Sequence, residues 1–265
     1  MYEAVGGSIG ISEVFWYGKE GVYEVMVLDY LGTSLGDLID QLQIDERSAF
    51  SYATEMVCRL YRTKKQSYQT HPLMQLSAVQ SLHSQDYIHC DIKPGNFMIR
   101  DHKHRPTVFL IDFGLAQLFR DPRTNLHRPF TTDHSIIGTL PFSSVNCQQG
   151  YAQSRRDDLE SLAYTIIYLA LGDLPWTSNT AEINEEAVFH KKPSITAEEL
   201  CDGLPAPFCD FVTYVRSLGF DEEPDYQYLH SILLRCSETE TNPPIEASLP
   251  FKRPLNTPTI STGRV

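Results

Sequence analysis

The chain has 265 residues, of which 42% are hydrophobic, and it carries a formal net charge of -12. This length and hydrophobic content are enough for one sizeable globular core with at most a small accessory lobe. The acidic balance argues against nucleic acid as a partner, because nucleic-acid binding depends on lysine and arginine to neutralise phosphates.

The sequence offers no candidate membrane segment. No run approaches the roughly 18 to 20 apolar residues that a bilayer span requires, and residues 1–21 are neither basic nor apolar enough for a signal peptide. We therefore expect a cytoplasmic or nuclear protein, a monomer, with no membrane partner. The six cysteines are scattered without a CxxC pair, so neither a zinc site nor a disulfide framework is indicated, and we interpret them as reduced thiols.

The first elements expected along the chain are a β-hairpin and a short helix. Residues 10–28 are rich in aromatic and β-branched types and contain GKEG at 18–21, which predicts a turn between two strands. The segment TSLGDLIDQL follows, with Thr33 or Ser34 as N-cap and with apolar residues at helical spacing. This segment is predicted to be an amphipathic helix.

A second hairpin and three helices are expected further along the chain. Apolar runs at 96–99 and 108–111 flank the polar stretch DHKHRP, as in a hairpin. Residues 158–171 are apolar on nearly every face, which predicts a helix buried in the centre of the domain. Helical spacing appears again at 208–218 and 226–234.

The most informative stretch reads YIHCDIKPGNFMI and is followed, after a short interval, by LIDFGL. Together they spell HxDxKxxN and then DFG. In phosphoryl transfer, Asp91 can accept the proton of an incoming hydroxyl, and Lys93 can neutralise charge on the migrating group. Asn96 and Asp112 can supply hard oxygen ligands to Mg²⁺. A polar loop without chemistry is the alternative interpretation.

These motifs resemble those of protein kinases, and three longer stretches narrow the resemblance to the casein kinase 1 family. They are EVMVLDYLGTSLGDL, QSRRDDLESLAYTIIYLALGDLPW and YVRSLGFDEEPDYQYL. In addition, Ser144 to Asn146 stands where that family has Ser-x-Asn in place of the APE motif. The resemblance runs from Tyr2 to Leu234 and implies a serine/threonine kinase that uses ATP and Mg²⁺ on protein substrates.

The resemblance also implies a nucleotide site. Leu28 would be the gatekeeper beside a hinge, Asp29 to Leu31, that binds adenine through its backbone. The other nucleotide contacts would be a ribose-binding carboxylate and two apolar residues under the base, namely Asp37, Met98 and Ile111. Ordinary core packing is the alternative for the apolar members of this set.

The fold class implied by the resemblance is α+β, a protein-kinase-like fold with a mainly helical C-lobe and only a remnant β-hairpin of the N-lobe. Residues 1–31 would be the remnant strands and hinge, and residues 32–236 the C-lobe. Residues 237–265 are rich in Ser, Thr and Pro and are expected to form a disordered tail. Asp158 would brace the catalytic loop from the buried helix, which is a structural role.

The sequence lacks three parts with which a kinase holds ATP: the glycine-rich loop, the strand lysine and the helix glutamate that pairs with this lysine. GGSIGI at 6–11 is an alternative phosphate loop, but no V-A-I-K-like strand follows it. The family has a similar glycine-rich turn after the missing helix. We therefore expect a chain truncated at its N-terminus, whose activity in this form stays open.

Other departures concern control and substrate choice. Cys90 replaces the arginine of HRD, so a phosphorylated activation loop would meet no arginine there, and Cys90 as a nucleophile is an alternative interpretation. The family recognises acidic or phosphorylated substrates through a basic patch. Two positions of this patch are His134 and Pro141 here, and neither supplies a fixed positive charge, which leaves that preference open.

Residues 57–75 interrupt a predicted helix. The helical pattern of SYATEM stops before this segment, which contains Pro72, and resumes with LSAVQSLHS. Removing the segment gives SYATEMLSAVQSLHS, one amphipathic helix of the kind that the family has at this place. Because Val-Cys can be encoded GTATGT and glutamine CAG, the two ends of a spliceosomal intron, we hypothesise that the segment is translated intron. A genuine surface insertion is the alternative.

Three classes of function fit these observations. The first is ATP-dependent phosphoryl transfer to serine or threonine of proteins. The second is a pseudokinase or scaffold, which would bind protein partners without catalysis. The third is a small-molecule phosphotransferase, which would share the catalytic residues but not the stretches SRRDDLESL and SLGFDEEPDY.

Overall fold

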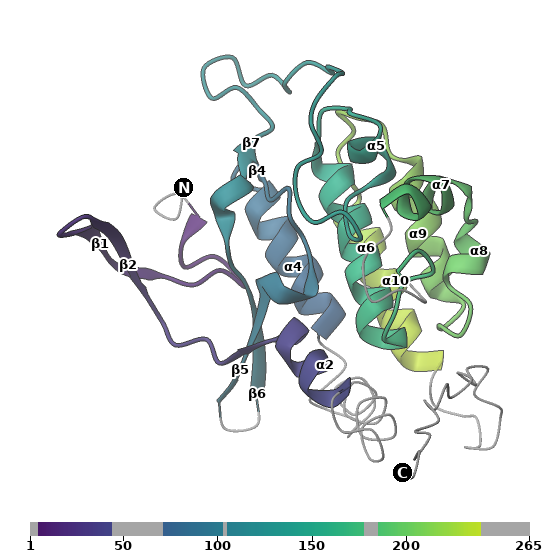
Figure 1. Ribbon diagram of the computed structural model, residues 1–265, viewed down its shortest axis with the longest axis horizontal. Helices are drawn as coiled ribbons and strands as arrows, with labels where there is room; N and C mark the ends of the chain where they lie inside the picture. The colour runs from purple at the N-terminus through teal and green to yellow at the C-terminus, as the bar shows by residue number, and fades with distance from the viewer. Residues whose placement is uncertain (1–4, 44–70, 103–104, 178–184, 240–265) are drawn as a thin grey trace, which may run out of the picture.

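In the computed structural model, the described residues are 5–43, 71–102, 105–177 and 185–239. Helices contain more of the described residues than strands do, and the strands make three small antiparallel sheets (Figure 1). Among the helices described, not one is long and apolar enough to span a bilayer. This combination of helices and small sheets agrees with the predicted α+β class.

The hairpin predicted near the N-terminus is present. β1 (Val14–Glu20) pairs antiparallel with β2 (Tyr23–Leu28), and the two strands project from the helical body (Figure 1). The turn lies at the end of the predicted GKEG, at residues 21 and 22. Gly21 has a φ of 63°, which gives the left-handed conformation that a tight turn requires, whereas the three residues before it stay in β1. That this hairpin is a remnant of a larger lobe stays a prediction.

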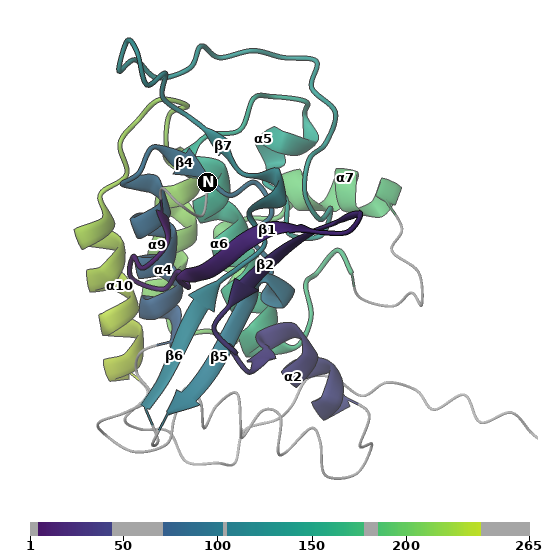
Figure 2. The ribbon, with the colours of Figure 1, turned by 90° about the vertical axis from the view of Figure 1, so that its left-hand side faces the viewer.

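A three-stranded sheet lies between the hairpin and the helices. Its strands, in the order β3-β5-β6, are β3 (Thr33–Ser34), β5 (Phe97–His102) and β6 (Arg105–Leu110). β5 and β6 form the second predicted hairpin, and both strands reach into the DHKHRP stretch. β6 packs against α4 (His71–His83), so the sheet is joined to the helical core (Figure 2).

The helix α2 (Leu35–Gln43) begins where the sequence predicts. The Ser34 hydroxyl accepts a hydrogen bond from the backbone N–H of Asp37 at 2.9 Å, the contact expected of an N-cap serine. Of the two predicted caps, Ser34 and Thr33, the structure therefore identifies Ser34.

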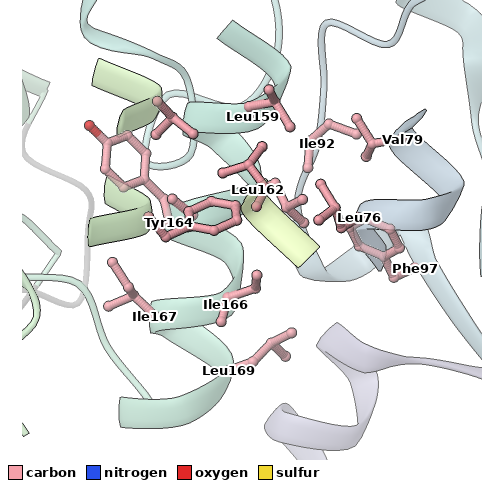
Figure 3. Packing of buried hydrophobic residues seen from close by; sticks show 14 of the residues in the cluster. Leu76, Val79, Ile92, Phe97, Leu159, Leu162, Tyr164, Ile166, Ile167 and Leu169 are labelled. Carbon is pink, nitrogen blue, oxygen red and sulfur yellow. The ribbon is translucent and has the colours of Figure 1, made fainter. Parts of the chain in front are cut away.

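The helix α6 (Arg155–Leu171) lies at the centre of the helical part. Ser154 and Asp157 form a capping box at its start, and side chains on all of its faces are buried, as the apolar pattern predicts. Figure 3 shows Leu162 of α6 directed toward Leu76 of α4, and both belong to the main hydrophobic core.

The two helices predicted near the C-terminus are α9 (Pro207–Ser217) and α10 (Tyr226–Thr239), which pack against each other. α10 continues into residues 237–239, where the sequence predicts the start of the disordered tail. The reason is that Cys236 still packs against the core, so the last turn has buried neighbours. The remainder of the predicted tail, 240–265, lies outside the described residues.

Other short elements were not predicted from the sequence. They are β4 (Tyr87–Ile88), which pairs with β7 (Gln117–Leu118), the single 3₁₀ turns η1 (Pro94–Asn96) and η2 (Phe113–Leu115), and the helices α5 (Val145–Gln148), α7 (Glu185–Ser194) and α8 (Ala197–Leu200). In α7 the described side chains are buried only at Val188 and Lys192, so its sequence has no apolar stripe.

The helix α4 begins at His71, inside the segment 57–75 that is predicted to be an insertion. Pro72 lies in the first turn, where its missing N–H has no helical partner to lose. Leu73 and Met74 pack partly against the core, which explains why the helix extends to this point. The earlier part of the segment and the SYATEM helix lie outside the described residues, so the intron hypothesis stays a prediction.

Candidate active site

Asp91 lies at the centre of a group of hydrogen bonds. Its Oδ1 accepts from the Thr139 hydroxyl at 2.7 Å, and its Oδ2 lies 2.8 Å from Lys93 Nζ and 3.2 Å from Asn96 Nδ2. Burial alone would raise the pKa of Asp91, but the hydrogen bonds from Lys93 and Thr139 outweigh burial and lower this pKa. The side chain is therefore a carboxylate at neutral pH. The three predicted catalytic residues, Asp91, Lys93 and Asn96, lie together.

Thr139 is a residue of this site that the sequence did not indicate. Lys93 Nζ donates to the Thr139 hydroxyl oxygen at 2.8 Å, and the same hydroxyl donates to Asp91. The preceding residue, Gly138, makes this approach possible: its φ is 95°, and a Cβ there would lie 2.4 Å from the Cys90 carbonyl oxygen. No local pattern in the sequence signals a contact between Thr139 and the catalytic loop.

Asp158 of α6 holds the backbone of the catalytic loop by hydrogen bonds. Its carboxylate accepts hydrogen bonds from the backbone N–H of His89 at 2.6 Å and of Cys90 at 2.9 Å, and it lies 2.9 Å from Nε2 of His83. Asp158 is 1% exposed, so water hardly competes for these contacts. The predicted bracing role of Asp158 is confirmed.

Cys90 has the surroundings of a structural thiol. It is buried, its φ of 67° is in the left-handed region, and its Sγ lies 3.2 Å from Nε2 of Gln117. Burial raises the pKa of Cys90 well above its ordinary value, so the thiol stays protonated. This environment does not support the alternative that Cys90 is a nucleophile.

His89 connects the catalytic loop with the DFG segment. Its Nδ1 accepts from the backbone N–H of Asp91 at 3.2 Å, and its Nε2 donates to the carbonyl oxygen of Ile111 at 2.9 Å. Burial lowers the pKa of His89, which favours the neutral ring that this pattern requires. The ring also meets Phe113 edge to face at a centroid distance of 5.3 Å. The sequence places His89 in the HxDxKxxN motif but indicated no role for it.

Asn96 and Asp112 are suited to hold a divalent cation together with a phosphate group. The Nδ2 of Asn96 donates to the Asp91 carbonyl oxygen at 2.9 Å, so its Oδ1 is not used in this hydrogen bond. The exposed Asp112 has a φ of 62°, and its Oδ1 accepts from the Gly114 N–H at 3.3 Å. The Ile111 N–H donates to the Asn96 carbonyl oxygen at 2.9 Å, which joins the two segments.

Asn96 and Asp112 offer two oxygen donors, which suits an ion such as Mg²⁺ that does not need a complete shell of protein side chains. Within the described ranges, no group of three or more His, Cys, Asp and Glu side chains could hold a metal ion. Mg²⁺ commonly binds one or two protein oxygens and completes its shell with phosphate and water. The predicted metal role of Asn96 and Asp112 stays a prediction that the donor set supports.

The predicted hinge lies along the edge of the three-stranded sheet. Asp29 is exposed and forms an ion pair with Arg100 of β5, Oδ2 to Nη1 2.9 Å, while Leu31 is buried. Gly32 has a φ of 84°, and a Cβ there would lie 2.3 Å from the Ile99 carbonyl oxygen. The close approach of this glycine to β5 fixes where the hinge enters the helical part.

The other predicted nucleotide contacts lie near this edge. Met98 of β5 is half-buried and pairs with Ser34 of β3, and Ile111 directly follows β6. Leu28 ends β2, and Asp37 is exposed in the first turn of α2. Their roles toward the adenine and ribose of ATP stay predictions.

The glycine-rich segment at 6–11 packs against the core. The Gly10 carbonyl oxygen accepts from the Leu110 N–H at 2.8 Å, and a Cβ at Gly10 would lie 2.5 Å from the Cβ of Ala78 in α4. Ile11 is buried and bridges to Leu110. These contacts support the interpretation of a structural turn over the alternative of a phosphate loop.

A protein kinase domain model matches residues 13–213, and the chain therefore belongs to the protein kinase family. It is 37% identical over 250 residues to casein kinase I homolog 3 of Schizosaccharomyces pombe, covering 90% of this chain and 53% of that protein. It is 39% identical over 236 residues to casein kinase I homolog 2 of the same organism, covering 87% and 50%. The chain spans about half the length of these curated relatives, and the predicted resemblance to the casein kinase 1 family is confirmed.

Proposed function

We propose that this chain is an ATP- and Mg²⁺-dependent protein kinase that transfers a phosphoryl group to serine or threonine side chains of proteins. The observation that carries the proposal is the position of the Asp91 carboxylate, which accepts a hydrogen bond from Thr139 and forms an ion pair with Lys93. A fixed carboxylate of this kind is suited to accept the proton of a substrate hydroxyl. The family membership supports the same reaction.

Each remaining group would have one task. Lys93, shared between Asp91 and Thr139, would orient the base and place a positive charge beside the migrating group. Asn96 and Asp112 would hold Mg²⁺, which when bound would neutralise charge on phosphate oxygens. The hinge and the apolar residues on β5 and after β6 would contact adenine.

We propose acidic proteins as the substrate class, because both relatives are named casein kinase I homologs and casein is an acidic protein. His134 is exposed and its Nε2 lies 2.7 Å from the Thr131 hydroxyl, while Pro141 is buried. Neither offers a fixed positive charge to a phosphorylated residue, so we propose that priming by phosphorylation is not required. A cytoplasmic or nuclear location, a monomeric state and the absence of nucleic-acid or membrane partners stay predictions.

The test is phosphorylation of dephosphorylated casein by the purified chain with Mg²⁺ and ATP. Asp91→Asn keeps the shape of the side chain but removes the base, so turnover is expected to fall by about 10² to 10⁴-fold. Asp202→Asn, an exposed position away from the site, is the matched control and is expected to keep wild-type turnover. Equal turnover by Asp91→Asn and the wild type would exclude the proposal.

A second candidate function is a scaffold that binds protein partners without catalysis. One observation favours it: several aromatic side chains of the β1–β2 hairpin are exposed, as at a protein-binding surface. A wild-type chain that neither binds ATP nor phosphorylates casein would establish the scaffold in place of the kinase.

A further inference from the structure

Lys192 is a fully buried lysine on a helix that is otherwise mostly exposed. Its exposed fraction is 0%, whereas its neighbours Lys191 and Pro193 are exposed. Placing an amine in the interior costs free energy unless it is hydrogen-bonded or paired with charge. The position of Lys192 therefore has to be explained by what its amine contacts.

The amine of Lys192 holds a loop that leads away from the catalytic base. Nζ donates to the carbonyl oxygens of Leu140 at 2.9 Å and of Ser143 at 2.8 Å. The same amine lies over the rings of Trp176 and Tyr164, 4.9 and 5.2 Å from their centroids, a cation–π arrangement. All of its direct partners are therefore the loop backbone or aromatic faces.

Trp176 adds a third donor to the same loop. Its Nε1 donates to the carbonyl oxygen of Pro141 at 2.9 Å. Three carbonyls in a stretch of four residues, 140–143, are thus bound by side chains from outside the loop. A loop of this kind has no strand or helix partner, so these donors fix its backbone shape.

The residues on either side of this loop are also held by hydrogen bonds, and Thr139 on the N-terminal side contacts the catalytic base. Thr139, directly before the loop, donates to Asp91 and accepts from Lys93. Ser144, directly after it, caps α5 and donates to the carboxylate of Asp157 in α6. Residues 140–143 therefore directly follow a residue that contacts Asp91, the carboxylate to which a polypeptide substrate would present its hydroxyl.

Titratable groups from three helices lie near the Lys192 amine. Burial lowers the pKa of Lys192 to about 7, and the charge of Glu160 of α6 acts against this shift. Cys147 of α5 also raises this pKa, while Arg216 of α9 lowers it. The amine can donate to both carbonyls in either protonation state, so the geometry is compatible with the lowered pKa.

We propose that Lys192 is a positioning residue for the polypeptide substrate: through the carbonyls of Leu140 and Ser143 it fixes the loop against which that substrate binds. This inference rests on the proposed kinase function. Lys192 does not touch Asp91, Lys93 or the residues proposed for ATP, so it should affect the binding of the polypeptide and not that of the nucleotide.

The experiment compares Lys192→Met with Lys191→Met in the full chain. Both changes replace a lysine of α7 by methionine. Lys192→Met removes the two loop hydrogen bonds, whereas Lys191→Met removes an exposed hydrogen bond to the Pro175 carbonyl oxygen, outside the loop. For Lys192→Met we expect the KM for dephosphorylated casein to rise about tenfold, the loss expected for one or two hydrogen bonds, with the KM for ATP unchanged. Lys191→Met should leave both constants as in the wild type. A KM for casein that Lys192→Met leaves unchanged would overturn the proposal.

Backbone amide exchange of residues 140–145 is a second readout that requires no turnover. We expect these amides to exchange about tenfold faster in Lys192→Met than in Lys191→Met. If the wild type proves inactive, the kinase function fails, while this exchange still decides whether Lys192 holds the loop. Equal exchange rates in the two variants would show that Lys192 does not hold the loop.

A third variant covers the case in which Lys192→Met does not fold. Trp176→Phe keeps an aromatic face but removes the donor to the Pro141 carbonyl. It should raise the KM for casein and the exchange of the loop in the same direction by a smaller factor. A Trp176→Phe chain that is folded and unchanged in both readouts would count against the positioning of substrate by this loop.

Discussion

At the scale of residues, buried polar groups decide both the shape of the site and the weak point of the core. Asp158 satisfies two backbone N–H groups of the catalytic loop, so the cost of burying its charge is offset by strong hydrogen bonds. Gln75 of α4 is the opposite case. It is 0% exposed, and neither its Oε1 nor its Nε2 has a hydrogen-bond partner. A buried amide left in this state costs about 1 to 3 kcal/mol.

We expect Gln75→Met to stabilise the fold, because methionine has a similar length and no polar atom to satisfy. The free energy of unfolding should rise by about 1 to 3 kcal/mol, measured by urea denaturation. Gln85→Met, at an exposed position just after α4, is the control and should change it by less than about 0.5 kcal/mol. A Gln75→Met chain no more stable than the wild type would mean that the amide has a partner in solution.

At the scale of elements, the sequence predicts those that have a regular pattern along the chain. α6 is apolar on nearly every face, and both hairpins combine apolar runs with turn residues, so local residues alone indicate these elements. α7 could not be found in this way, since its buried side chains are Val188 and the polar Lys192.

The residues of the candidate site also fall into two groups: those that a local motif indicates and those that only a long-range contact brings to the site. The residues of the motifs HxDxKxxN and DFG were indicated by sequence because their spacing is local. Thr139 was not, because it meets Asp91 across 48 residues of chain and no periodic pattern records such a contact. The loop carbonyls held by Lys192 are a further contact of this kind, made by backbone atoms that carry no sequence signal.

The start of α4 gives a test of the intron hypothesis. Deleting 57–75 would place Met56 directly before Leu76, in the position of the buried Gln75. We expect the deletion variant to fold and to unfold at higher urea than the full chain, because an apolar side chain replaces an unsatisfied amide.

Two outcomes would contradict this expectation. A deletion variant that aggregates or unfolds at lower urea than the full chain would identify 57–75 as a genuine insertion on which the fold depends. Spliced messenger RNA that retains the segment would also reject the intron hypothesis. The Gln75→Met variant separates the two effects, because it changes the buried residue and keeps the segment.

At the scale of the whole molecule, stability is expected to be unequal between the helical part and the β1–β2 hairpin. The core is built from α4, α6, α9 and α10 together with the three-stranded sheet. The hairpin projects from this body (Figure 1). Several of its large apolar side chains are exposed: Phe15, Trp16, Tyr17, Tyr23, Met26 and Val27. An isolated two-stranded hairpin is at best marginally stable in water.

We therefore expect the amides of β1 and β2 to exchange with solvent about a hundredfold faster than those of α6, because the hairpin can open without unfolding the core. Hydrogen exchange followed by mass spectrometry measures both in one sample, so α6 is the internal control. Equal protection would contradict this expectation and would mean that a partner covers the aromatic face. Repeating the measurement after tenfold dilution identifies that partner as a second copy of the chain if protection then falls, because self-association depends on protein concentration.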